Sequence, residues 1–557
     1  MSFVLLESGS KVRKSMHNTS SGRVGVMFTS GAAFSGGTLR RMQRLQCACF
    51  WFSVVTLISL LALCWMYICL VTFNDQEDVN WKSFKLLRLW VNWFMVVVII
   101  SAILTTYCIL LLLFAMFQVA LREPLNLHWL HKGLLCLGVL FITFGITGIS
   151  LMWWKEWLTI SLSLQATAPF LQMGGVGALT LLSPLVIQSY HRARRAGSKT
   201  LIIVVFAMVS AAIFLCPLLI HSPCLIEGSE LPTKPDLIGH RGVPMLAPEN
   251  TMMSFRRSVA ACNVTAFETD VQLSKDRVPF LMHDTDSEFL MRTTDITEKF
   301  PGQKFPCSTS ITWAELQILN AGDWFIKTDP FRSVSLLSAE ERATARIQNI
   351  SPLLELLELA KQYNISVIFD LKMATKGDND TEDVVKTILK SGIAPGLVLW
   401  LPPEEREYVM QVAPGFVQVY DNITDMDEEG GHHLNVKYNA LSAAEIRELR
   451  GRNVSVNLWV VNERWLFSLL WCSGASSVTT NSCHLLQDMT QPDWTMAPYK
   501  YRMIWITVDL VSLVVIFGLF IFQRKRCCFS DAPGKGMQRN KFSARNWRDS
   551  SPFLPAE

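Results

Sequence analysis

The sequence predicts an α-helical membrane protein with six transmembrane helices and one extramembrane α/β domain, a (β/α)8 (TIM) barrel. Charged residues make up 18% of the 557 residues, fewer than the roughly 25% of ordinary soluble domains. Only 15 of them fall between residues 47 and 221. The segment 222–500, in contrast, alternates short apolar runs with charge-bearing amphipathic stretches, which indicates alternating strands and helices. The net charge of +4 is too small to indicate nucleic-acid binding.

Six apolar stretches are long enough to cross a membrane. A bilayer core requires roughly 20 apolar residues in a helix, because unpaired backbone groups are too costly in hydrocarbon. The first five stretches contain no ionisable residue in their interior, which argues against a transporter. The sixth contains Asp509, for which an interfacial structural role is favoured over a functional one. The six stretches are roughly 47–73, 89–121, 133–153, 160–187, 201–220 and 503–522.

Basic residues predict the orientation of these spans. Lys and Arg cluster before the first span, between the fourth and fifth, and after the sixth, and such clusters favour the cytosolic side. Both termini are therefore expected in the cytosol, and the large segment outside the cell or in a lumen, at the plasma membrane or an endomembrane. The predicted parts are a cytosolic tail (1–46), five spans (47–221), the barrel with its linkers (222–500), the sixth span (501–523) and a second cytosolic tail (524–557).

Glycosylation motifs agree with this orientation. Six Asn-x-Ser/Thr motifs without proline fall inside the large segment, and such motifs are modified in secretory compartments. Several of them can also be unused. The predicted acceptors are Asn263, Asn349, Asn364, Asn379, Asn422 and Asn453.

The large segment has the order of elements expected for a closed parallel barrel of about 250 residues. Eight strands are predicted at 236–240, 266–271, 278–282, 366–371, 397–401, 416–420, 454–460 and 476–480. Helices are predicted at 254–261, 352–363, 381–391, 404–412, 443–450 and 465–472. Catalytic residues of such barrels lie at the carboxyl ends of the strands.

Seven ionisable residues occupy the ends of the first four predicted strands. Side chains two apart on a strand point to one side, so the two acids of the second strand, and the acid and lysine of the fourth, can face one cavity. Three carboxylates there would repel each other without a cation, and oxygen ligands suit Mg²⁺ or Ca²⁺. The seven residues are His240, Arg241, Glu268, Asp270, His283, Asp370 and Lys372.

This set supports the cleavage of a phosphodiester. The cation and Arg241 would neutralise the phosphate, Lys372 would hold a phosphate oxygen, and one histidine would accept a proton while the other donates one. Which of His240 and His283 has which role stays open. Taken singly, a barrel histidine is more often a structural hydrogen-bonding residue and an acidic pair more often a surface feature, so the prediction depends on their joint placement.

Ordered motifs around these residues resemble the glycerophosphodiester phosphodiesterase family. The motifs are Gly239-His240-Arg241-Gly242, Pro248-Glu249-Asn250-Thr251, Phe267-Glu268-Thr269-Asp270, His283-Asp284, Arg292-Thr293-Thr294, Leu319-Asn320-Ala321-Gly322 and Trp459-Val460-Val461-Asn462. They span roughly residues 236–486, and the six spans resemble the animal transmembrane subgroup of that family.

The resemblance implies a role for each residue that matches the motifs. It makes His240 and His283 the acid/base pair and assigns Trp459 to substrate binding. Arg241 and Lys372 would hold phosphate, and the metal ligands would be Glu268, Asp270 and Asp370. The third ligand is usually Glu in the family, and Asp370 is one methylene shorter.

The sequence is compatible with three functions. The favoured one is metal-dependent hydrolysis of glycerophosphodiesters to an alcohol and glycerol phosphate. A second is phospholipase-C-like cleavage of glycosylphosphatidylinositol anchors or inositol glycerophosphodiesters, and a third is an inactive adhesion or signalling ectodomain. The expected partners are a small glycerophosphodiester or a lipid-anchored surface molecule, together with the bilayer.

Two further expectations concern geometry. Both ends of a (β/α)8 barrel lie on its amino-terminal side, and both are tied here to spans, so the active mouth is expected to point away from the bilayer. Among the cysteines of the large segment, Cys472 with Cys483 and Cys262 with Cys307 are predicted as possible disulfides, although the sequence does not choose among connectivities.

Overall fold

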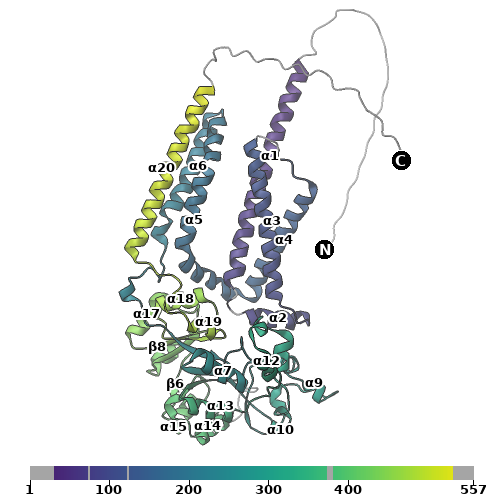
Figure 1. Cartoon of the computed structure of the whole chain (residues 1–557), viewed down its shortest axis with the longest axis vertical. Coiled ribbons are helices and arrows are strands. Elements are labelled where there is room, and N and C mark those ends of the chain that lie inside the picture. Colours follow the sequence, from purple (N-terminus) through teal and green to yellow (C-terminus); the bar gives the residue numbers. More distant parts are fainter. Residues whose placement is uncertain (1–30, 73, 75, 122–124, 373–379, 531–557) are drawn as a thin grey trace, which may run out of the picture. The chain divides into compact units, whose positions relative to one another are not determined.

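The computed structural model describes residues 31–72, 74, 76–121, 125–372 and 380–530 (Figure 1). Within these residues, six helices are long and apolar enough to span a membrane, as predicted. They fit a multi-pass membrane protein. Their bounds are α1 Gly31–Thr72, α3 Trp93–Leu121, α4 Trp129–Met152, α5 Trp157–Arg192, α6 Ala196–Leu215 and α20 Pro498–Ser530. The predicted acceptor Asn379 lies outside the described residues.

The chain packs as two units, each of which is described by itself. The first contains the described residues up to Leu63 together with Leu104–Leu140, and the second contains Cys64–Ile103 and the described residues from Phe141 onward. In the first unit the Ser59 hydroxyl donates to the Cys108 carbonyl (3.0 Å). In the second unit, α5 packs against both α6 and α20. The second unit also contains the whole barrel and every candidate site residue.

Eight parallel strands form the barrel. Their order is β6, β5, β4, β2, β1, β9, β8, β7, and a parallel bridge between Tyr420 and Leu434 joins the two ends. The strands are β1 Asp236–His240, β2 Ala266–Leu273, β4 Ser366–Leu371, β5 Val398–Trp400, β6 Val417–Gln418, β7 His433–Lys437, β8 Ser455–Trp459 and β9 Ser477–Thr480. The predicted barrel class is therefore confirmed.

One of the predicted barrel strands was wrong, and one barrel strand was missed. The third predicted strand is β3 (Pro279–Leu281), which pairs antiparallel with β2 and lies off the barrel path. A tight turn, in which the Ser274 amide donates to the Val278 carbonyl, returns the chain too soon for the crossover that parallel strands need. The barrel strand missing from the prediction is β7. Its polar sequence, His433-Leu434-Asn435-Val436-Lys437, did not indicate a strand.

Helices cover the outside of the barrel. In α13 (Leu353–Tyr363), for example, Leu353, Leu356, Leu357 and Ala360 are buried, the spacing of a helix with one apolar face. The other covering helices are α7 Met252–Cys262, α14 Asp380–Ser391, α15 Arg406–Val412, α16 Ile423–Glu428, α17 Ala443–Gly451, α18 Arg464–Ser473 and α19 Cys483–Gln487. A long insertion follows β3 and contains α8 Ser287–Thr293, α9 Ile296–Lys299, α10 Trp313–Leu316, α11 Asp323–Thr328 and α12 Ala339–Arg346.

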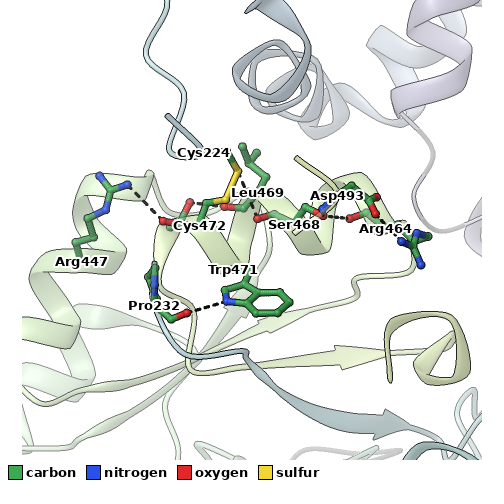
Figure 2. Close-up of a disulfide and its surroundings, with 10 residues drawn as sticks. Cys224, Pro232, Arg447, Arg464, Ser468, Leu469, Trp471, Cys472 and Asp493 are labelled. Carbon is green, nitrogen blue, oxygen red and sulfur yellow. Dashed lines mark hydrogen bonds and ion pairs between the residues drawn. A yellow bond between two sulfur atoms is a disulfide. The ribbon is translucent and has the colours of Figure 1, made fainter. Parts of the chain in front are cut away.

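Two disulfides connect Cys224 with Cys472 and Cys262 with Cys483. Both predicted pairings were therefore wrong. Figure 2 shows the first bond, which joins the linker after α6 to the end of α18, beside the Trp471 indole that donates to the Pro232 carbonyl (2.8 Å). The second joins α7 to α19, which pack together. Cys307 is a free thiol, 3.1 Å from the Thr309 hydroxyl.

Candidate active site

The ionisable residues gather at one end of the barrel, above an apolar layer in its interior. His283 follows the antiparallel strand β3, so the prediction that it ends a barrel strand was wrong. The apolar layer consists of Ile238, Ala266 and Ile368. Two residues further along these three strands are His240, Glu268 and Asp370. Because side chains two apart on a strand point the same way, the apolar layer closes the barrel floor and the polar residues form one cluster above it.

The three predicted metal ligands come together. Glu268, Asp270 and Asp370 each offer a carboxylate oxygen, and these oxygens lie within 4.8 Å of one another. Asp270 and Asp370 are direct neighbours in the register of β2 and β4. Burial and the nearby charge of Asp270 raise the pKa of Glu268 well above its usual value. Mutually repelling acids of this kind fit a divalent cation bound by oxygen ligands.

Two basic residues flank the acids. Lys372 Nζ lies 2.7 Å from Asp370 Oδ2 and 3.3 Å from Asp270 Oδ1, and Arg241 Nε lies 3.1 Å from Asp270 Oδ2. Burial lowers the pKa of Lys372, but the charges of Asp270 and Asp370 raise it above its usual value. Burial raises the pKa of Asp270, but the charges of His283, Arg241 and Lys372 have the larger effect. The pKa of Asp270 is therefore below its usual value. A bound phosphate would therefore meet two cationic side chains beside the acids.

A tight turn after β1 aims Arg241 into the site. Gly242 has φ +87°, and a Cβ there would lie 2.4 Å from the Ser254 hydroxyl oxygen, so only glycine fits. Within this turn the Arg241 amide donates to Glu268 Oε2 (3.0 Å), and the Arg241 Nη1 donates to Glu249 Oε2 (3.1 Å). The Gly-His-Arg-Gly segment therefore fixes both the arginine and one of the acids.

His240 lies beside the acids and is half-buried. Its Nδ1 is 2.6 Å from Asn481 Oδ1, and its Nε2 is 3.7 Å from Glu268 Oε2. Burial and the neighbouring Arg241 guanidinium lower the pKa of His240 to about 3. In this arrangement the imidazole is neutral, which is the form that accepts a proton.

His283 is held by the residue that follows it. Its Nδ1 lies 2.7 Å from Asp284 Oδ1, so the other ring nitrogen is left for the pocket. Burial raises the pKa of Asp284, but the hydrogen bond and charge of His283 lower it to about 2. An ionised carboxylate at this position orients the ring.

All eight predicted site residues line one cavity of about 770 Å³. The eighth is Trp459, at the end of β8, whose side chain is partly exposed to the cavity (38%). The cavity is also lined by Asn435, Lys437 and Asn481 from the last strands of the barrel. Aromatic walls with a few placed polar groups are typical of small-molecule sites.

The segments that connect the apolar helices also line the cavity, and the direction of its mouth relative to a bilayer stays a prediction. The cavity wall includes Thr72 at the end of α1, and Trp153 and Glu156 between α4 and α5. Glu156 Oε1 accepts a hydrogen bond from Lys437 Nζ (2.6 Å). This polar contact holds the segment between α4 and α5 against the barrel.

Three residues that hold the site were missed by sequence reasoning. Asn250 donates to Asp270 Oδ2 (2.9 Å), and Asn481 contacts His240 as described above. Both could have been found from the sequence, because Asn250 lies in one of the quoted motifs and Asn481 directly follows the last strand. The Trp81 indole donates to Asp284 Oδ2 (2.9 Å), and its distance of about 200 residues from the barrel motifs left no sequence signal.

Comparison with known proteins shows the family of this chain. The profile of the Glycerophosphoryl diester phosphodiesterase family matches residues 240–394. A relative from Mus musculus, Glycerophosphoinositol inositolphosphodiesterase GDPD2, is 43% identical over 489 residues, which cover 87% of this chain and 90% of that protein. The chain belongs to the glycerophosphoryl diester phosphodiesterase family. It is a phosphodiesterase by that membership, as the resemblance predicted.

Other members of the family have similar coverage. Glycerophosphodiester phosphodiesterase domain-containing protein 5 from Homo sapiens is 39% identical, over 86% of this chain and 79% of that protein. Glycerophosphodiester phosphodiesterase domain-containing protein 4 from Mus musculus is 35% identical, over 86% of this chain and 81% of that protein. The crystal structure of a putative glycerophosphoryl diester phosphodiesterase from Silicibacter pomeroyi matches with a TM-score of 0.39 and 20% identity, over 47% of this chain and 96% of that one.

Proposed function

We propose that this chain hydrolyses glycerophosphodiesters to an alcohol and glycerol phosphate with the help of a divalent cation, Mg²⁺ or Ca²⁺. One observation carries the proposal: three carboxylate oxygens lie within 4.8 Å of one another in the same cavity as His240 and His283. A cation held by Glu268, Asp270 and Asp370 would supply Lewis-acid stabilisation of the phosphoryl oxygens.

The chain's own residues would then carry out the proton transfers. Arg241 and Lys372 bind the phosphate and orient it between the two histidines. One histidine removes a proton from the attacking water as its oxygen bonds to phosphorus, and the other protonates the alkoxide as its bond to phosphorus breaks. Asn481 and Asp284 hold the two rings by their Nδ1 atoms, which leaves both Nε2 atoms for these transfers.

Glycerophosphoinositol is the first substrate we propose. The GDPD2 relative is named for this compound, and a cavity of about 770 Å³ with an exposed tryptophan face accommodates an inositol ring. A second candidate is the phosphoinositol group of a glycosylphosphatidylinositol anchor. It is favoured by the position of the cavity against the ends of α1 and α5, because an anchor embedded in the same membrane would lie beside those ends.

We further propose that the barrel lies outside the cell or in a lumen, with both termini in the cytosol. The basic clusters support this orientation. So do the two disulfides, which persist in oxidising compartments. The five predicted acceptors among the described residues are exposed, as glycosylation requires; they are Asn263, Asn349, Asn364, Asn422 and Asn453.

A substrate panel on the purified full-length protein tests the proposal. With Mg²⁺ or Ca²⁺ present, we expect hydrolysis of glycerophosphoinositol, glycerophosphocholine or glycerophosphoethanolamine, and no hydrolysis after chelation of divalent ions. Release of a lipid-anchored reporter from vesicles that contain the protein measures the second candidate. If every substrate stays intact with either cation, the inactive ectodomain becomes the better account.

A further inference from the structure

Helix α2 (Gln76–Leu87) connects the first two apolar helices and lies against the loop that carries His283. The Trp81 indole donates to Asp284 Oδ2 (2.9 Å), and Lys85 Nζ lies 3.7 Å from the same oxygen. The other oxygen of that carboxylate, Oδ1, is bonded to His283 Nδ1 (2.7 Å). A continuous chain of hydrogen bonds therefore runs from α2 to the imidazole.

The position of Trp81 is fixed by its neighbours on both sides. Its ring stacks on Phe84 (centroids 5.3 Å apart) and meets the edge of Phe289 (5.6 Å). The Arg292 guanidinium lies 4.6 Å from the centroid of the Trp81 ring. A cation and two aromatic rings around an indole restrict its rotation. The N–H group of Trp81 is therefore held in the direction of Asp284.

Ion pairs hold the helix to the same part of the barrel. Lys85 pairs with Asp286 (3.0 Å) and Arg88 pairs with Glu288, both within six residues of His283. Exposed ion pairs contribute little stability individually. Here they hold α2 against the segment that follows β3, so that Trp81 lies opposite Asp284.

We propose that Trp81 is a positioning residue for the reaction, which acts through Asp284 on the orientation and tautomer of His283. The proposal rests on the proposed role of His283 in proton transfer. A carboxylate whose second oxygen is occupied by a fixed donor presents its first oxygen in one direction, so Nδ1 keeps its hydrogen and Nε2 faces the cavity. The segment between the first two spans is then part of the active site, and the barrel without it is incomplete.

The test uses full-length protein in lipid nanodiscs and the variant Trp81→Phe, which keeps the aromatic packing but removes the N–H donor. We expect kcat to fall about tenfold, as for other lost hydrogen bonds that orient a histidine through a second residue, with KM and the thermal midpoint unchanged. Trp90→Phe is the matched control, because Trp90 also contacts Arg292 and is not bonded to Asp284; its kcat should equal that of the native protein.

A double-mutant cycle shows whether Trp81 acts through Asp284. In the Asp284→Asn background, Trp81→Phe should cause no further loss of kcat, since the acceptor has already changed. Losses that multiply in the double variant, or native kcat for Trp81→Phe alone, would overturn the proposal.

Nitrogen NMR of histidine-labelled protein separates this proposal from the proposed function, because it requires no turnover. We expect His283 to carry its hydrogen on Nδ1 in the native protein and to populate both tautomers in Trp81→Phe. An unchanged tautomer in that variant contradicts the positioning role. A native protein that is inactive on every substrate but shows the tautomer change contradicts only the proposed function.

Discussion

Replacing His240 or His283 with alanine is expected to lower kcat by about 10²–10⁴-fold, the usual contribution of a general acid or base. Each imidazole is held at Nδ1 by a separate partner, Asn481 or Asp284, and each lines the cavity that contains the acids. Stopped assays of glycerol phosphate release measure the effect.

The double variant His240→Ala/His283→Ala should lose less than the product of the single losses, because residues that act as a unit are not additive. His432→Ala is the matched control, since this histidine is exposed at the other end of the barrel, next to the start of β7, and its removal should leave kcat unchanged. Native activity in either single variant would exclude that histidine from the proton transfers.

Asp270→Asn is expected to lower kcat/KM at least about 100-fold. Lewis-acid stabilisation by a bound cation is worth several kcal/mol, and about 1.4 kcal/mol corresponds to a factor of ten in rate. Asp270 is buried at the centre of the cluster, within reach of Arg241 and Lys372. Glu355→Gln, at an exposed position of α13, is the control for the loss of one acid and should behave like the native protein.

Asp370 offers a graded version of the same test. Asp370→Glu keeps the charge, restores the usual residue of the family and should remain active, whereas Asp370→Asn should lose activity as Asp270→Asn does. Equal activity of all these variants, or full activity of the native protein after chelation, would contradict the metal-dependent mechanism.

The barrel class and the principal site residues were predictable because both depend on local patterns. Alternating side chains on β2 and β4 place Glu268, Asp270 and Asp370 on one side of their strands, and the structure brings them together as the register requires. The wrong predictions concern contacts between segments, which the pattern within a single strand does not indicate. The connection before β3 is too short for the crossover that parallel strands need, so the antiparallel pairing of β3 with β2 could have been predicted from the sequence.

The disulfides and the residues that other segments add to the cavity could not be predicted, because they depend on tertiary contacts between distant parts of the chain. Trp81 and Glu156, for example, come from the segments between the apolar helices and contact the barrel. Cys224 lies 248 residues before its partner Cys472, and only the packing of the linker against α18 brings them together.

Locating the cation tests the central claim most directly. We expect an experimental structure of the full-length protein, prepared with Mn²⁺ in place of Mg²⁺ or Ca²⁺, to place one ion about 2.0–2.6 Å from oxygens of Glu268, Asp270 and Asp370, and the ion to be absent from the Asp270→Asn variant. An ion bound elsewhere in the cavity, or no ion at saturating Mn²⁺, would contradict the account.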